Sequence, residues 1–96
     1  MKFIQIIEYT TTKPDEAQAA LDKYLADSEG KRLNTSGTTT RDRDNPNTYM
    51  NIVAFPSYEA AMKNAELPQT QALAETMMKL ADGPPIFRNL DVIFEG

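Results

Sequence analysis

Apolar side chains recur along this chain with two different periods, and the order in which these periods alternate restricts its fold more than any other feature of the sequence. Segments rich in β-branched and aromatic residues indicate strands, whereas apolar residues that recur about every three to four positions predict helices. In chain order, the sequence predicts a strand at 2–9, a helix at 14–29, a polar strand at 33–43, a strand at 48–55, a short helix at 57–64, a helix at 68–81 and a strand at 86–94. The segment 33–43 has no large apolar residue after Leu33, so a loop is the alternative there.

Proline, glycine and small polar residues mark the ends of these elements. Thr12 precedes Asp15 by three residues and Pro14 lies between them, a spacing typical of a capping box at the start of a helix. Gly30 suits the left-handed conformation that commonly ends a helix. The polar cluster at 44–47 favours a turn, so the strands on either side of it are predicted to form a hairpin.

This order of elements is that of the ferredoxin-like α+β fold, βαββαβ, in which helices cover one face of a four-stranded antiparallel sheet. The chain has 96 residues and a typical domain has about 100 to 150, so we expect a single domain over residues 1–96.

Both faces of the predicted central strands are apolar. In the segment 48–55, one face carries Tyr49, Val53 and Phe55, and the opposite face carries Met50, Ile52 and Ala54. A face in contact with water would be polar, and the chain has no further element to cover it. We therefore expect a homodimer joined sheet to sheet, with contact through the face that carries Tyr49, Val53 and Phe55 or through the edge of that face.

Composition and charge exclude several kinds of site and partner. The chain contains no histidine and no cysteine, which excludes thiolate metal sites, histidine-based catalytic triads and histidine-ligated haem; we expect no metal and no cofactor. A net charge of -4 disfavours nucleic acid as a partner. No stretch approaches the roughly 18 to 20 apolar residues of a membrane span, and the N-terminal residues lack the pattern of a signal peptide. We expect no contact with a membrane, and a cytoplasmic location.

The string Phe-Pro-Ser-Tyr-Glu-Ala-Ala-Met-Lys-Asn at 55–64 resembles the aromatic-x-Ser-x-Glu-Ala motif of the dimeric α+β barrel superfamily. In particular it resembles the antibiotic biosynthesis monooxygenase-like branch, and the order of elements agrees over nearly the whole chain. The resemblance implies a homodimer whose two sheets form a barrel, with a pocket between the sheet and the helices of each subunit.

The residues at the family's active positions depart from its pattern. The branch includes cofactor-free oxygenases that act on polyketide phenols, and haem-degrading enzymes. Its active members typically have a Trp, a His and an Asn at the positions that here look like Phe55, Asn64 and Ile7. Because the His and the indole are missing, the resemblance implies a pocket and leaves open whether the protein is an enzyme.

Polar residues within the apolar strands are the most informative candidates for a site. Gln5 shares a strand face with Ile7 and Tyr9, and Asn51 lies between Tyr49 and Val53 on theirs. A polar group in an apolar face costs roughly 1 to 3 kcal/mol unless it is hydrogen-bonded, so each amide needs a structural partner, a water or a ligand. Asn64 is a further candidate, with a helix C-terminal cap as its alternative role.

We expect one ligand-binding pocket lined by Gln5, Ile7, Tyr9, Tyr49, Asn51, Phe55 and Asn64, with Asn51, Tyr49 and Asn64 as weak catalytic candidates. Amides would supply directional hydrogen bonds and aromatic rings would supply flat walls. If Gln5 and Asn51 lay on the helix-packed face, or beside a barrel interior without a cavity, the pocket assignment would fail.

Three classes of function remain open. The first is a homodimeric barrel that binds a small apolar or aromatic ligand. The second is a cofactor-independent monooxygenase that acts on a polyketide-like or quinol substrate. The third is a structural dimer whose barrel is filled by side chains.

Overall fold

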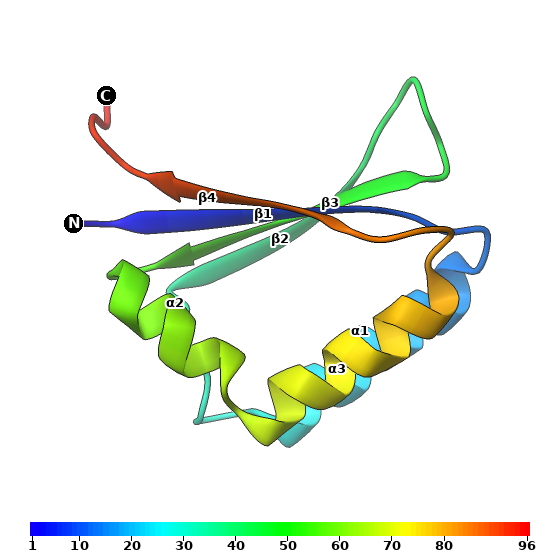
Figure 1. Ribbon diagram of the computed structural model, residues 1–96, viewed down its shortest axis with the longest axis horizontal. Coiled ribbons are helices and arrows are strands. Elements are labelled where there is room, and N and C mark those ends of the chain that lie inside the picture. The colour runs from blue at the N-terminus through cyan, green and yellow to red at the C-terminus, as the bar shows by residue number, and fades with distance from the viewer.

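The computed structural model describes residues 1–96, and its elements follow the predicted order. They are β1 (Phe3–Thr10), α1 (Pro14–Asp27), β2 (Ser36–Arg41), β3 (Thr48–Phe55), α2 (Tyr58–Ala65), α3 (Pro68–Leu80) and β4 (Ile86–Asp91). The strands form one antiparallel sheet in the order β2-β3-β1-β4. Figure 1 shows this sheet edge-on, with all three helices on the same side of it. The predicted ferredoxin-like α+β fold is confirmed.

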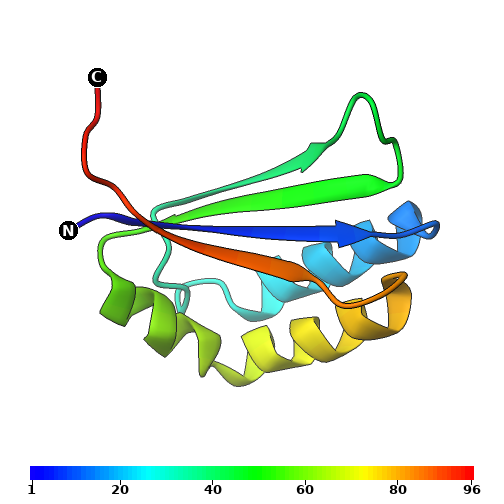
Figure 2. The ribbon, with the colours of Figure 1, turned by 45° about the horizontal axis from the view of Figure 1, so that its top comes forward.

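The helices cover the sheet unevenly. α1 and α3 run side by side beneath one end of the sheet, and α2 lies beneath the other end, as Figures 1 and 2 show. Ser57 caps α2, because its hydroxyl accepts a hydrogen bond from the Ala60 amide (3.1 Å). None of the helices is both long and apolar enough to cross a membrane.

The start of α1 differs from the predicted capping box. α1 begins at Pro14, and no side chain caps its N-terminus. Instead, the buried Thr11 hydroxyl accepts a hydrogen bond from the Lys13 amide (3.0 Å) and donates one to the Leu80 carbonyl (2.7 Å). Thr11 therefore joins the start of α1 to the end of α3, a long-range contact that local spacing does not reveal.

Four predicted elements are longer than the observed ones, and the helix predicted at 68–81 exceeds α3 by a single residue. α1 ends at Asp27 rather than at residue 29, β2 covers only 36–41, and β4 ends at Asp91. β2 and β4 are the two edge strands, so each has a neighbour on one side only. Apolar alternation led to the prediction that the last strand extends to residue 94. In the structure, β4 pairs with β1 only as far as Asp91, and Ile93 and Phe94 beyond it are 91% and 83% exposed.

One face of the sheet packs against the helices, and it is the face that carries Tyr49, Val53 and Phe55. The core lies at its α2 end, where Phe3, Phe55 and Ala61 are each at most 4% exposed. The predicted dimer contact through this face is therefore wrong, because helices of the same chain already cover it. Alternation along a strand shows that both faces are apolar, but it does not show which face the helices take.

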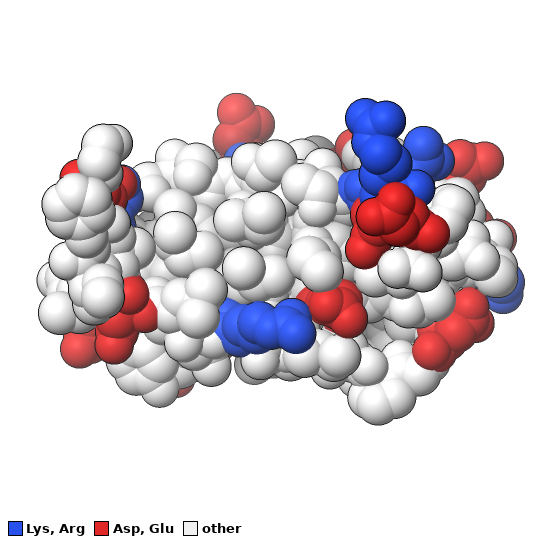
Figure 3. All heavy atoms as spheres, turned by 90° about the horizontal axis from the view of Figure 1, so that it is seen from above, with Lys and Arg blue, Asp and Glu red and all other residues white.

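The opposite face of the sheet has no helix over it, and we call it the open face. Figure 3 looks onto this face, whose central part is formed mainly by uncharged residues. Its apolar side chains include Ile4, Ile6, Met50, Ile52, Ala54, Ile86 and Leu90. Ile52, Leu90 and Ile86 are 36%, 42% and 47% exposed. Only seven of the 96 residues are fully buried, so much of the apolar surface of the sheet is not covered by its own chain.

Candidate functional site

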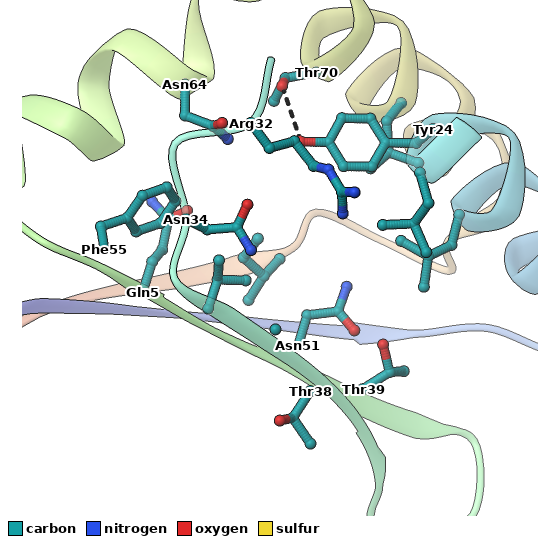
Figure 4. A pocket seen from close by; sticks show the side chains of 16 residues that line it. Gln5, Tyr24, Arg32, Asn34, Thr38, Thr39, Asn51, Phe55, Asn64 and Thr70 are labelled. Carbon is teal, nitrogen blue, oxygen red and sulfur yellow. Dashed lines mark hydrogen bonds between the residues drawn. The ribbon is translucent and has the colours of Figure 1, made fainter. Parts of the chain in front are cut away.

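A cavity of about 290 Å³ lies between the sheet and the helices α1 and α3. Residues of β1, β2 and β3 form its floor, α1 and α3 form its roof, and the segment that joins α1 to β2 crosses it, as Figure 4 shows. The space remains open because α1 and α3 pack on each other, while the large core rings of Phe3 and Phe55 gather near α2.

Five of the seven side chains predicted to bind a ligand line this cavity. They are Gln5, Ile7, Asn51, Phe55 and Asn64. The other two, Tyr9 and Tyr49, line a smaller cavity of about 40 Å³ and stack on each other with their ring centroids 5.6 Å apart. Leu21 and Thr39 border both cavities, so the tyrosines lie next to the main cavity rather than within it.

Gln5 and Asn51 lie on the helix-packed face of the sheet, a placement that we expected to rule out a pocket. A cavity is nevertheless present beside both amides, because the helices stand away from the middle of the sheet. Its place, between the sheet and the helices of one subunit, is the place that the family resemblance implied.

Two side chains that line the cavity each carry a buried polar atom without a hydrogen-bond partner, Oδ1 of Asn51 and Nε of Arg32. Asn51 extends from β3 and Arg32 extends from the segment after α1, so the two side chains point toward each other in Figure 4. Buried polar groups almost always have partners, and an unpaired one costs roughly 1 to 3 kcal/mol. Neither atom would lose a hydrogen bond if its side chain turned toward a ligand.

Asn64 already has a structural partner. It is buried, and its Oδ1 accepts a hydrogen bond from the Leu33 amide (3.0 Å). The expected alternative role as a helix cap is wrong, because α2 continues to Ala65 and Glu66 is its C-terminal cap. Asn64 instead holds the segment between α1 and β2, which carries Arg32, in place against α2.

Other polar groups at the edges of the cavity are paired within the chain. The Gln5 amide nitrogen donates a hydrogen bond to Oδ1 of Asn89 (3.1 Å), and the hydroxyls of Tyr24 and Thr70 are 3.2 Å apart. No carboxylate and no histidine lines the cavity. The site can therefore bind and orient a ligand, but it has no side chain that would act as an ordinary base at neutral pH.

The electrostatic environment of the tyrosine pair differs from that of water. Burial raises the pKa of Tyr9, the neighbouring Tyr49 raises it further, and the Asn51 amide partly offsets this increase. Tyr9 therefore remains a neutral phenol over the physiological range, and it serves as a donor more readily than as a base.

Several cavity residues were not among the predicted site residues. Leu21, Tyr24 and Leu25 fall on the apolar face that predicted α1, so the sequence does contain a signal that they point toward the sheet. Arg32 and Asn34 lie in an irregular segment, where no period indicates the direction of a side chain. Their place in the cavity depends on the hydrogen bond between Leu33 and Asn64, two residues that are distant in sequence.

The relationship to known proteins is visible in structure and not in sequence. No family model matches the chain, and no curated protein matches it either. Among solved structures, SnoaB, a cofactor-independent oxygenase from Streptomyces nogalater, is similar, with a TM-score of 0.83 at 17% identity, over 98% of this chain and 95% of SnoaB.

Two further solved structures agree with that result. A provisionally assigned antibiotic biosynthesis monooxygenase from Caulobacter crescentus has a TM-score of 0.85 at 14% identity, over 97% of this chain and 91% of that one. A conserved protein from Methanosarcina mazei has a TM-score of 0.85 at 5% identity, over 94% of this chain and 91% of that one. The chain therefore has the fold of the antibiotic biosynthesis monooxygenase-like proteins, and the resemblance found in its sequence is confirmed at the level of the fold.

Proposed function

We propose that this protein binds a small planar aromatic ligand with oxygen substituents in the cavity between its sheet and its helices. The observation that carries the proposal is a cavity whose lining includes two side chains with unpartnered polar atoms, those of Asn51 and Arg32. Binding sites for small molecules are mostly apolar, with a few convergent polar groups that fix the orientation of the ligand. This cavity has both features.

The shape and the lining of the cavity support a flat ligand of modest size. Ile7, Val53 and Phe55 provide apolar surface from the sheet, and Leu21, Leu25 and Leu73 provide it from the helices. The volume of about 290 Å³ is near the lower end of the usual range for small-molecule sites, which starts at roughly 300 Å³. An open cavity of this size favours ligand binding over a structural dimer whose interior is filled by side chains.

A calorimetric titration with naphthols and hydroxynaphthoquinones tests this proposal. We expect saturable binding, and we expect Leu73→Trp to weaken it by at least about tenfold, because the indole would occupy the space of the ligand. Met78→Trp is the matched control, because Met78 is on the same helix and is 69% exposed. If the two variants bound equally well, the ligand would not occupy this cavity.

Cofactor-independent oxygenation is the second candidate function. It is favoured by the fold that this chain shares with SnoaB, which is described as an oxygenase of that kind. No carboxylate or histidine lines the cavity, so the substrate would have to be acidic enough to lose its proton before reaction with dioxygen. Dioxygen uptake with hydroxylated anthrones and quinols would support this candidate, and binding without uptake would leave a non-catalytic binding protein.

We also propose that two copies of the chain associate through their open faces. The face is apolar along its centre, and its ion pair between Arg88 and Glu8 (3.4 Å) leaves little net charge to be desolvated. Large exposed apolar faces are unusual on monomers, and a second copy of the same face is a self-complementary partner. Analytical ultracentrifugation at micromolar concentration should detect a dimer, and a monomer would refute the proposal.

A further inference from the structure

We infer that Arg32 makes the cavity selective for ligands that carry an anionic oxygen, with an aromatic carboxylate as the best match. This inference rests on the proposed function, because it names the class of ligand that the same cavity would bind. It goes beyond that function because a cavity of this shape could equally accept neutral aromatic compounds.

Arg32 is the only charged side chain among the residues that line the cavity. The ion pairs of the protein join Lys2 to Glu95, Lys23 to Asp27 and Arg88 to Glu8, so none of them involves Arg32. Its Nε atom is buried and has no hydrogen-bond partner. The residue as a whole is partly exposed, so its guanidinium has water as its only partner, and an anionic ligand would replace that water.

The backbone around Arg32 is anchored on both sides. The amides of Lys31 and Arg32 donate hydrogen bonds to the carbonyl of Ser28 (2.9 and 3.3 Å), and Ser28 is fully buried. On the other side, the Leu33 amide donates to the Asn64 side chain (3.0 Å). The loop therefore holds the start of the arginine side chain in place before a ligand arrives, which lowers the entropy cost of binding.

The arrangement of donors and acceptors selects the chemistry of the ligand. A guanidinium donates two parallel hydrogen bonds to a carboxylate, and these charge-assisted bonds are stronger than neutral ones. The unpartnered Oδ1 of Asn51 is an acceptor, so it requires a donor such as a ligand hydroxyl. Figure 4 shows the guanidinium and the Asn51 amide on opposite sides of the same space. An aromatic ring with a carboxylate on the side of Arg32 would satisfy the guanidinium, and a donor on the opposite side of the ring would suit Asn51.

The charge of the whole protein opposes the binding of anions, so it cannot be the source of the preference that we expect from Arg32. The net charge is -4, so the protein as a whole repels anions. Any preference for an anionic ligand over its neutral analogue must therefore come from local groups. Arg41 is an exposed arginine in β2 outside the cavity lining, and it serves as the matched control for a change of one charge.

Two pairs of probes separate the carboxylate from other sources of negative charge. The first pair is 1-hydroxy-2-naphthoate and its neutral carboxamide, which share one ring system. The second pair is 2-hydroxy-1,4-naphthoquinone, whose acidic hydroxyl is ionised at neutral pH, and its methyl ether. Dissociation constants of all four are measured by calorimetry for the wild type, Arg32→Gln, Arg32→Lys and Arg41→Gln.

We expect the wild type and Arg41→Gln to bind the naphthoate about 10- to 100-fold more tightly than the carboxamide, as a charged hydrogen-bonded pair would give. Arg32→Gln should lose this preference and bind the carboxamide as the wild type does. Arg32→Lys should keep part of it, because lysine retains the charge without the planar fork. The ionised quinone should show a smaller preference over its ether, because it offers one anionic oxygen for two donors.

The thermal stability of the free protein gives a second readout. If Arg32 serves a ligand, Arg32→Gln should leave the melting temperature unchanged or raise it, because an unpaired cation is removed. If Arg32→Gln lowered the melting temperature and weakened naphthoate and carboxamide binding equally, Arg32 would stabilise the fold rather than recognise the anion. That result would overturn the inference.

The other outcomes separate the inference from the proposed function. Equal wild-type affinity for the naphthoate and the carboxamide would overturn the anion selectivity alone, since the cavity would still bind aromatic ligands. Loss of the preference in Arg41→Gln rather than in Arg32→Gln would overturn the role of Arg32 alone. If the wild type bound none of the four probes and none of the neutral naphthols, both proposals would fall.

Discussion

The two faces of the sheet have similar apolar composition but different surroundings. The face beneath the helices combines a small core at one end with a cavity at the other, and two side chains with unpartnered polar atoms line that cavity. The open face has no covering element, and its centre is apolar. The difference shows that amphipathic alternation alone does not assign a function to a face. The polar residues that interrupt the alternation carry more information.

Ile52 and Val53 are adjacent residues of β3, and one lies on each face of the sheet. Val53 lines the cavity and packs against the core of Phe3, Phe55 and Ala61, whereas Ile52 is 36% exposed on the open face. Neighbouring side chains in a strand point to opposite faces, so a substitution at one position tests one face only.

The largest expected effect is that of Val53→Asp. The carboxylate would lie beside the apolar core at a cost of about 3 to 5 kcal/mol, a large part of the stability of a small domain, and combination with Arg32→Gln removes the one cation that lines the same cavity. Chemical denaturation followed by circular dichroism should show a protein that is unfolded or close to unfolding. Ile52→Asp is the internal control, since its carboxylate can reach water on the open face, and equal loss of stability in both variants would contradict the assignment of the faces.

Ile52→Asp should have the second largest effect, and on assembly rather than on folding. In a dimer with two-fold symmetry the new carboxylates would come close to each other, and like charges at an interface cost several kcal/mol. We expect the dimer to dissociate at concentrations at least about 100-fold higher than for the wild type. Met78→Asp, an exposed position on α3, should leave the dimer intact. Sedimentation velocity of the three proteins measures this difference.

The third prediction separates two asparagines on the same side of the sheet. Asn51→Ala should weaken binding of a hydroxylated aromatic ligand by about tenfold and lower the melting temperature less than Asn64→Ala does, because its Oδ1 has no partner in the free protein and its amide acts only on Tyr9. Asn64→Ala should lower stability by about 1 to 3 kcal/mol, because it leaves the Leu33 amide unpaired. Calorimetry and thermal denaturation of both variants are required, and the reverse pattern would exchange the two roles.

The sequence was sufficient for features that depend on local patterns. The strand at 48–55 was predicted with its observed ends, because β-branched and aromatic residues fill it and Pro56 follows it. The side-chain alternation of β1 and β3 also brought Gln5 and Asn51 to one face. Features that depend on contacts between distant residues were not predicted, because their partners are set only by the folded chain.

Arg32 and Thr11 illustrate this limit. The direction of Arg32 follows from the hydrogen bond that fixes its loop to Asn64, and Thr11 joins the ends of two helices through the Leu80 carbonyl. Neither contact leaves a periodic signal. The choice of the helix-covered face was unpredictable for a related reason, because both faces offered the helices similar apolar surface.

The smallest expected effect concerns Tyr9, which lies on the helix-covered face and has no counterpart on the open face. Burial and the adjacent Tyr49 raise the pKa of Tyr9 above its usual value of 10.0. The folded protein therefore keeps the phenolic proton at pH values where the unfolded chain has lost it, so this contribution is fully present below pH 10.0 and is lost as pH rises through the folded pKa. In Tyr9→Phe the free energy of unfolding should fall less steeply above pH 10.0 than in the wild type, as urea denaturation at a series of alkaline pH values would measure. Identical slopes would mean that the phenol is not shielded from water by the helices, and would remove this difference between the two faces.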